Sequence, residues 1–225
     1  MKIVYYGHAC FGIEVNQTKI IVDPFITGNP LAESIDINML KVDYILVTHA
    51  HQDHTLDVEI LAKKNDATII SNYEICMHYI NLGLKAHPLN HGGIFKTEDF
   101  SAKFTAAVHT SSFPDGSYGG EPGGFLLTTQ EASLYVAGDT ALTHDMKLIP
   151  LWAQLDLAIL PIGDTFTMGY QDAIIASDFM ECNKIIGCHY NTFPPIEICK
   201  QEAQKAFKNH QKELILLKIG ESYTV

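Results

Sequence analysis

The sequence predicts an α/β fold in which two β-sheets pack together and helices cover them from outside, an α/β/β/α sandwich. Short apolar, β-branched runs bounded by turn residues recur along the whole chain of 225 residues, and amphipathic helical patterns separate several of the later runs. No segment of flexible composition divides the chain. We therefore expect residues 1–225 to form one layered domain.

The predicted strands are the apolar, mostly β-branched runs. In chain order they are Lys2–Tyr6, Gly12–Val15, Ile20–Asp23, Tyr44–Thr48, Thr68–Ser71, Phe104–His109, Gly124–Thr128, Ser133–Gly138, Leu157–Ile162, Lys184–Cys188 and Leu214–Ile219. The predicted helices are the amphipathic segments His54–Asn65, Tyr73–Leu82, Tyr170–Cys182 and Pro195–His210. The proline pair before the last segment is a typical helix start.

Charge and composition exclude several functional classes. The formal net charge is −11, and all 15 basic residues are lysines, so neither a basic face nor arginine contacts to phosphate are expected, and duplex nucleic acid is not an expected partner. No run of ~18 apolar residues predicts a membrane span. The N-terminus lacks the continuous apolar stretch of a signal peptide. We expect a cytoplasmic protein acting on a small molecule; the sequence leaves open whether it forms a homo-oligomer.

The strongest motif is Thr48-His49-Ala50-His51-Gln52-Asp53-His54, a His-x-His-x-Asp-His cluster between an apolar strand and a helical pattern. Loops at the end of a buried strand are common places for functional sites, because a rigid element fixes them. Imidazole and carboxylate together suit a borderline metal such as zinc. On such a loop His49 and His51 can face one metal, while Asp53 and His54 turn toward a second.

Three more residues of ligand type follow apolar runs. His109 ends Phe104–His109, Asp139 follows Gly138, and His189 follows Cys188. Each alone is more often a turn or capping residue. Their common position after a strand favours one shared site.

This order of motifs resembles the metallo-β-lactamase superfamily. The match includes the His-x-His-x-Asp-His cluster, a lone histidine, Gly138-Asp139-Thr140 and a late strand-end histidine. The surroundings of His8, residues 160–169 and residues 188–194 look like a group of cytoplasmic metal-dependent hydrolases similar to the ascorbate-6-phosphate lactonases. The resemblance implies the four-layer α/β/β/α sandwich of that superfamily.

By position, the resemblance implies two metal sites. His49, His51 and His109 would hold the first metal, Asp53, His54 and His189 the second, and Asp139 would bridge them. The two divalent ions would be zinc, with manganese or iron as alternatives. They would activate a bridging hydroxide for hydrolysis, and Asp53 would orient it as the catalytic residue. No cysteine stands at a motif position, unlike in true β-lactamases.

Other residues carry weaker predictions. Asp23 is expected to orient a ligand histidine or to form a plain turn. His8 is expected to face the site or to be a turn residue, and Tyr190, Asn191 and Thr192 are substrate contacts or a polar turn. The glycine-rich segment 117–124 is interpreted as a mobile hairpin or lid.

The ligand-bearing segments contain no lysine and the chain no arginine, so a bidentate phosphate clamp is excluded. The sequence therefore favours a small lactone, ester or amide as the substrate. A phosphodiesterase or nuclease of the same fold is the enzymatic alternative. A metal-binding regulator without catalysis is the alternative from another class.

Overall fold

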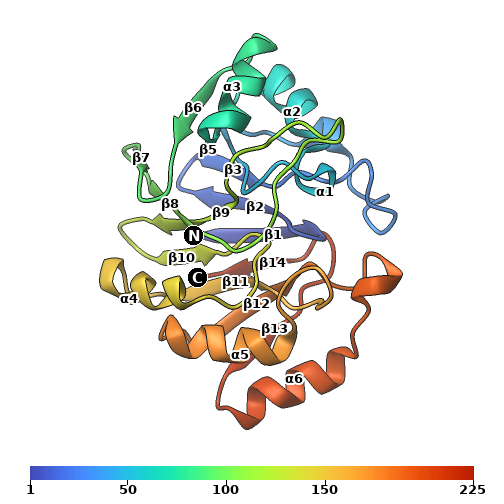
Figure 1. Cartoon of the computed structure of the whole chain (residues 1–225), viewed down its shortest axis with the longest axis vertical. Helices are drawn as coiled ribbons and strands as arrows, with labels where there is room; N and C mark the ends of the chain where they lie inside the picture. Colours follow the sequence, from blue (N-terminus) through green and yellow to red (C-terminus); the bar gives the residue numbers. More distant parts are fainter.

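Two mixed β-sheets of seven strands each form the centre of the structure, a computed structural model that describes all residues 1–225 (Figure 1). The first sheet contains, in spatial order, β14 (Ser222–Thr224), β1 (Lys2–Gly7), β2 (Cys10–Val15), β3 (Thr18–Val22), β4 (Tyr44–Leu46), β5 (Thr68–Asn72) and β6 (Ala86–Leu89). The second contains β13 (Glu213–Ile215), β12 (Lys184–Cys188), β11 (Leu157–Pro161), β10 (Ser133–Val136), β9 (Gly123–Thr128), β8 (Ser101–Ala106) and β7 (Ile94–Lys96).

Helices lie outside both sheets. They are α1 (Gln52–Thr55), α2 (Val58–Asn65), α3 (Tyr73–Asn81), α4 (Ile149–Trp152), α5 (Tyr170–Phe179) and α6 (Lys200–Asn209), with short 3₁₀ helices at Ile37–Met39, His144–Leu148 and Pro194–Ile196. None of these helices has the length and apolar character to cross a membrane.

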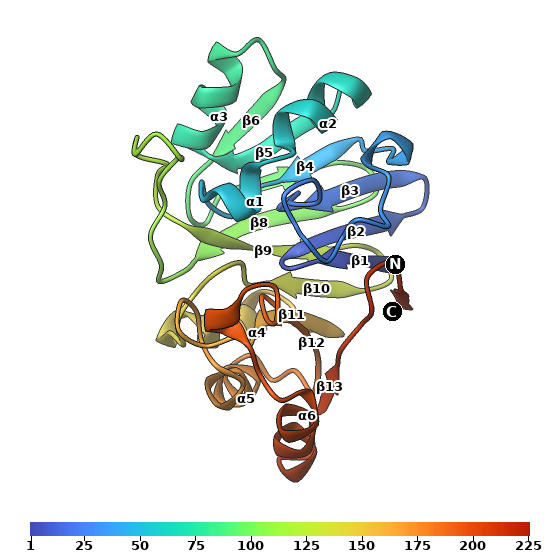
Figure 2. The same cartoon turned by 90° about the vertical axis from the view of Figure 1, so that its right-hand side faces the viewer.

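Three apolar layers hold the sheets and helices together. A cluster of 22 buried residues, including Phe11, Phe104 and Phe125, fills the space between the two sheets. A second cluster of 20 residues packs the second sheet against α5 and α6, and a third of 17 packs the first sheet against α2 and α3. Figure 2 shows the resulting four layers. The predicted α/β/β/α sandwich is confirmed.

The burial of each strand follows its place in these layers. Strand β1 alternates buried and less buried residues, which is the period of two expected for a sheet with one covered face. Strand β11, between two parallel neighbours, is buried at every position. Its continuous apolar run Leu157–Pro161 is typical of a strand covered on both faces.

The strand directions bring distant loops to one place. In the first sheet β1, β3 and β4 run in the same direction, and in the second sheet β8, β10 and β12 do. Their carboxyl ends therefore lie at one edge of each sheet. Every residue predicted to ligate or orient a metal lies in the segment after one of these six strands.

Several element boundaries differ from the predictions. The predicted helix His54–Asn65 is two helices, α1 and α2, because the backbone N–H of Asp57 between them donates to the carbonyl of Pro24 at 3.1 Å and not to a carbonyl of α1. The predicted strand Phe104–His109 is displaced to β8, which ends at Ala106. The predicted helix Pro195–His210 starts only at Lys200, after a 3₁₀ turn, and the strand Leu214–Ile219 is shortened to β13.

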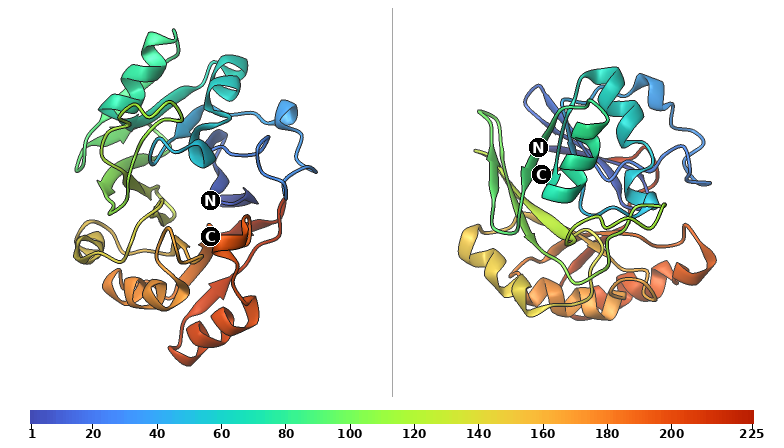
Figure 3. Two further views of the ribbon diagram at one scale, coloured as in Figure 1. Left: turned by 45° about the vertical axis from the view of Figure 1, so that its right-hand side comes forward. Right: turned by 45° about the horizontal axis from the view of Figure 1, so that its top comes forward.

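Short edge elements were missed by the sequence patterns. They are β6, β7, β14 and α4. Strand β14 pairs with β1, and the backbone N–H of Val225 donates to the carbonyl of Met1 at 3.0 Å. Figure 3 shows the two chain ends lying side by side. The C-terminal strand thus completes the N-terminal sheet, a pairing between residues too distant for a local pattern to predict.

Candidate metal centre

Three histidines from two loops form the first ligand group. His49 and His51 follow β4, and His109 follows β8. The Nε2 atom of His49 lies 3.0 Å from Nδ1 of His51, and the ring of His109 lies 5.0 Å from that of His49 and 5.1 Å from that of His51. One nitrogen from each ring lies within 4.8 Å of the others. The structure therefore brings together the three residues expected to hold the first metal.

The second group combines α1 with the end of β12. Asp53 Oδ2 lies 3.7 Å from Nε2 of His189 and 3.9 Å from Nε2 of His54. The Nε2 atom of His8, after β1, lies 3.0 Å from the same carboxylate oxygen. His8 is thus part of this group, as the sequence left open.

Asp139 lies between the two groups. Its Oδ2 atom is 3.0 Å from His189 Nε2 and 3.3 Å from His54 Nε2, on the side of the second group. It is also 3.6 Å from His109 Nε2 and 3.9 Å from His49 Nε2, on the side of the first. One buried carboxylate thus faces imidazoles of both groups.

Asp23 and Thr48 fix the orientation of His54. Asp23 Oδ2 accepts a hydrogen bond from His54 Nδ1 at 2.8 Å, and Asp23 also accepts from the backbone N–H and the hydroxyl of Thr48. A carboxylate behind an imidazole in this way sets its tautomer and leaves the other nitrogen free to ligate. The structure thus places Asp23 in the orienting position rather than in a plain turn.

The backbone is strained at three of these positions. His8, Asp23 and His189 have φ values of 55°, 46° and 52°, although each carries a side chain. Left-handed backbone of this kind costs of order 1–3 kcal/mol per residue and is concentrated at functional sites. Each residue follows a strand directly and turns its side chain toward the cluster. Glycine would relieve the strain but would remove the functional group.

Two glycines let neighbouring segments approach the cluster. A Cβ atom on Gly138 would lie 2.7 Å from Cβ of Thr48, and one on Gly119 would lie 2.2 Å from Cβ of Ala50. The carbonyl of Gly119 also accepts hydrogen bonds from Asn72 and Ser111. The glycine-rich segment 117–124 therefore packs against the loop that carries His49 and His51, and it does not line the cavity.

The donor atoms fit divalent metal ions. His54 Nε2 and Asp139 Oδ1 are buried and have no hydrogen-bond partner. An unpaired buried polar atom costs about 1–3 kcal/mol, and a cation bound by that atom would offset the cost. Imidazole nitrogens and carboxylate oxygens are ligands that zinc accepts.

Burial keeps the first histidine group neutral. It lowers the pKa of His49 well below the usual value, and it also lowers the pKa of His51 and His109. Burial likewise lowers the pKa of His8 to about 4. A neutral imidazole has the free electron pair that a metal needs.

Around Asp139 the pKa values of the histidines are raised, in contrast to those of the first group. Burial disfavours a charged imidazole, but the neighbouring carboxylates, Asp139 first among them, together outweigh it, raising the pKa of His189 to about 9 and that of His54 well above its usual value. Burial also opposes ionisation of Asp53 and Asp139, yet the surrounding histidines, His54 first among them, together hold the pKa of both carboxyls below the ordinary range. This region thus stabilises positive charge, which a divalent cation would supply.

Two residues suggested as substrate contacts lie elsewhere. Tyr190 is 4% exposed and packs in the apolar cluster between the second sheet and its helices. Asn191 accepts a hydrogen bond from the backbone N–H of Ile198 and so stabilises its own loop. Neither residue lines the cavity at the cluster. The structure thus agrees with a turn role for Asn191 and places Tyr190 in the apolar core.

The cavity at the cluster has a volume of about 540 Å³ and nine lining residues. Five are predicted ligands, and the other four were not identified from the sequence: Thr110, Thr165, Phe166 and Phe193. Thr192, considered above as a substrate contact, does not line the cavity; its hydroxyl lies 2.9 Å from Nδ1 of His8. Phenylalanine and threonine in loops carry no ligand pattern, so only the fold reveals them.

Comparison with known proteins agrees with this geometry. A family model described as "Beta-lactamase superfamily domain" matches residues 2–189. Proteins named "UPF0173 metal-dependent hydrolase" from Flavobacterium johnsoniae and Christiangramia forsetii are 60% and 58% identical to the chain, and each match covers 99% of both chains.

Two solved structures resemble the chain closely. Igni18, described as a novel metallo hydrolase from Ignicoccus hospitalis, superposes with a TM-score of 0.90 at 29% identity, covering 100% of this chain and 98% of that one. YhfI from Bacillus subtilis, described as a metallo-beta-lactamase fold protein, has a TM-score of 0.75 at 15% identity, covering 99% of this chain and 98% of that one. The second likeness concerns the fold alone, and it confirms the predicted fold type.

Proposed function

This chain belongs to the β-lactamase superfamily and, within it, to the UPF0173 metal-dependent hydrolases; from that premise we propose that it hydrolyses a small lactone, ester or amide at a centre of two divalent metal ions. The position of Asp139 carries the binuclear part of the proposal. Its Oδ2 atom lies within 3.9 Å of imidazole nitrogens from both histidine groups. A carboxylate in that position suits a bridging ligand.

The residues divide into two ligand sets joined by one bridge. His49, His51 and His109 would hold one ion, Asp53, His54 and His189 the other, and Asp139 both. When bound, two such ions supply a hydroxide at neutral pH, polarise the scissile carbonyl and neutralise developing oxyanion charge. The ligand types favour zinc, with manganese or iron as alternatives.

Asp53 is the residue we assign to proton transfer. Its side chain is 30% exposed and lines the cavity. His8 Nε2 holds one carboxylate oxygen at 3.0 Å, and Thr192 holds His8 from behind at 2.9 Å. An ionised carboxylate fixed in this way can align a water nucleophile and later pass a proton to the leaving group.

The cavity favours a carbonyl substrate over a phosphodiester. None of its nine lining residues is a lysine, and the chain contains no arginine. A phosphodiester would therefore depend on the metal ions for its charge contacts, without the lysine or arginine side chains that usually help to bind phosphate. A phosphate group elsewhere on the substrate, as in the ascorbate-6-phosphate type expected from the sequence, would meet no lysine or arginine among the lining residues.

The proposal predicts two metal ions per chain and metal-dependent turnover. Protein purified without chelator should approach that ratio by elemental analysis, because seven ligands surround two positions. In a panel of lactones, esters, amides and phosphodiesters, turnover should appear on a carbonyl substrate, disappear with chelator and return with zinc or manganese.

Different failures have different meanings. One ion per chain, unchanged by added zinc or manganese, would contradict the binuclear centre. Turnover confined to phosphodiesters would favour the phosphodiesterase alternative. Two ions without any turnover would instead favour a metal-binding regulator.

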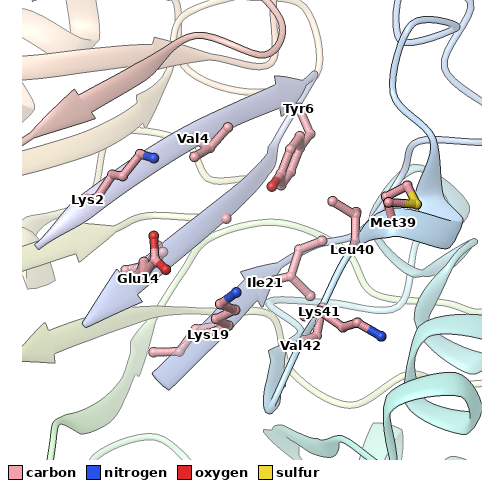
Figure 4. Close-up of a pocket in the computed structure, with 13 residues that line it drawn as sticks. Lys2, Val4, Tyr6, Glu14, Lys19, Ile21, Met39, Leu40, Lys41 and Val42 are labelled. Carbon is pink, nitrogen blue, oxygen red and sulfur yellow. The ribbon is translucent and has the colours of Figure 1, made fainter. Parts of the chain in front are cut away.

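We further propose a cytoplasmic enzyme without a nucleic-acid partner. The five cysteines are unpaired and four of them are buried, which suits a reducing compartment. A separate cavity of about 230 Å³ lies on the outer face of β1, β2 and β3, and Lys2, Lys19, Lys41 and Glu14 are among its 13 lining residues (Figure 4). This cavity gathers three of the 15 lysines in a chain with a net charge of −11.

Duplex DNA should bind no more tightly than the ~10⁻⁴–10⁻⁶ M typical of non-specific contacts at physiological salt. Repulsion between the DNA and the negatively charged protein should outweigh the attraction of three lysines. One of them, Lys41, points away from the other two in Figure 4. Fluorescence anisotropy with a labelled duplex measures the affinity. Submicromolar binding that is lost in a Lys2→Ala, Lys19→Ala, Lys41→Ala variant would show that these lysines dominate instead.

A further inference from the structure

Two phenylalanines form the apolar part of the cavity that contains the ligand cluster. Apart from five predicted ligands, the lining consists of Phe166, Phe193 and two threonines. Phe166 is 56% exposed, whereas Phe193 is half-buried. Beyond the ligands themselves, the cavity thus offers hydroxyls and phenyl rings and no charged group.

Phe193 is supported from behind by other aromatic rings. Its ring lies 5.4 Å from that of His8 and 6.3 Å from that of Phe25. His8 in turn contacts Asp53. Phe193 therefore forms a fixed wall beside the carboxylate that we assign to proton transfer.

Phe166 is held at the rim by a strained turn. The two residues before it, Asp164 and Thr165, have φ values of 63° and 61°, a conformation that residues with side chains rarely adopt. Such strain persists only where the surrounding structure enforces it, and it is concentrated at functional sites. An exposed phenyl ring presented by two consecutive strained residues therefore points to a ligand.

Hydrogen bonds fasten this turn to both sides of the site. The Thr165 hydroxyl donates to the carbonyl of Pro195 at 2.8 Å, which ties the turn to the segment carrying Phe193. The backbone N–H of Met168 donates to the carbonyl of Thr140, the residue after Asp139, at 2.9 Å. The turn is thus positioned relative to both the second phenylalanine and the ligand cluster.

We propose that Phe166 and Phe193 form an apolar clamp that selects an uncharged substrate with an alkyl or aryl group next to the scissile carbonyl. This inference rests on the proposed function and narrows its substrate class. The cluster would engage the carbonyl, while the two rings would remove the apolar group from water. A charged group at the same place would be buried against phenyl rings with no counter-ion.

The experiment measures chain-length dependence with and without the Phe166 ring. The substrates are p-nitrophenyl acetate, butyrate and hexanoate, used with metal-loaded full-length protein. The kcat/KM of the native protein should rise with acyl length. Phe166→Ala should lose roughly tenfold on the hexanoate and less than about twofold on the acetate, because a few methylenes in an apolar pocket have effects of this size. Phe166→Leu should restore most of the dependence.

Tyr73→Ala is the matched control, because Tyr73 is an exposed aromatic residue (51%) at the start of α3 and outside the cavity. It should behave as the native protein on all three esters. A Phe166→Ala variant that keeps the full chain-length dependence would overturn the clamp. The same conclusion would follow if the variant changed only the oligomeric state.

Binding of unreactive ketones separates the clamp from the hydrolysis. Titration calorimetry with 2-butanone, 2-hexanone and 2-octanone should show affinity rising with length in the native protein and a flat series in Phe166→Ala. 6-Oxoheptanoate, which adds a terminal carboxylate to 2-hexanone, should bind at least about tenfold more weakly than 2-hexanone. If no ester is hydrolysed but the ketone series behaves as expected, the proposed function fails while the clamp stands. Equal affinity for all ketones, or tighter binding of the carboxylate, would overturn the clamp.

Discussion

Asp139→Ala is expected to release both metal ions, whereas His109→Ala is expected to weaken mainly one. The reason is geometric, because Asp139 Oδ2 lies 3.0–3.9 Å from histidines of both ligand groups, while His109 is close only to His49, His51 and Asp139. Loss of an orienting partner outside the ligand shell already costs about 10–100-fold in metal affinity. Loss of a shared ligand should exceed that at both positions.

Metal occupancy at graded free zinc, measured by elemental analysis, checks this prediction. Asp139→Ala should remain below one ion per chain under conditions in which His109→Ala retains one. Asp115→Ala is a suitable control, because Asp115 is exposed, belongs to neither ligand group and forms side-chain hydrogen bonds only with Ser117. Identical losses in the Asp139 and His109 variants would contradict a bridging carboxylate.

The clustering of the candidate donors could be predicted from the sequence because most of them are close together in the chain. Four donors lie within six residues, from His49 to His54, directly after an apolar strand. The other three follow β8, β10 and β12, which run in one direction, so their ends meet at one edge. The predicted ends of the strands were less accurate. Two residues separate β8 from His109 and β10 from Asp139, because the chain leaves each sheet before it reaches the cluster.

The cavity walls could not be predicted in the same way. Phe166 and Phe193 stand in polar loops, and their role depends on how those loops are fastened to segments far away in the sequence. Tyr190 also shows that position in the sequence does not determine whether a residue lines the cavity. It directly follows a ligand, but its ring turns into the core under the helices. The edge strands β6, β7 and β14 are three or four residues long, too short for a periodic pattern.

Asp53→Asn is expected to keep much of its metal at saturating concentration and yet lose at least ~10² in turnover, within the ~10²–10⁴ range of general acid–base catalysis. Asparagine preserves the shape and one ligating oxygen but removes the charge and the ability to accept a proton. The structure adds a reason for a large effect. His8 Nε2, 3.0 Å from Asp53 Oδ2, aligns the carboxylate beside the cavity. An amide at this position can still bond to His8, so the variant should stay correctly placed while losing its chemistry.

Asp23→Asn provides the matched control for a carboxylate that acts through metal binding alone. Asp23 is buried, contacts His54 at 2.8 Å and does not line the cavity. Its loss should weaken metal binding by about 10–100-fold, and excess metal should restore its activity.

If Asp53 were only a ligand, the Asp53→Asn variant would behave in the same way as Asp23→Asn. Turnover and metal content must therefore be measured on the same samples across a metal titration. Asp53→Asn should stay inactive at full occupancy, where Asp23→Asn recovers, because occupancy restores the ligands but cannot replace the proton acceptor. Full recovery of both variants would assign Asp53 to metal binding alone.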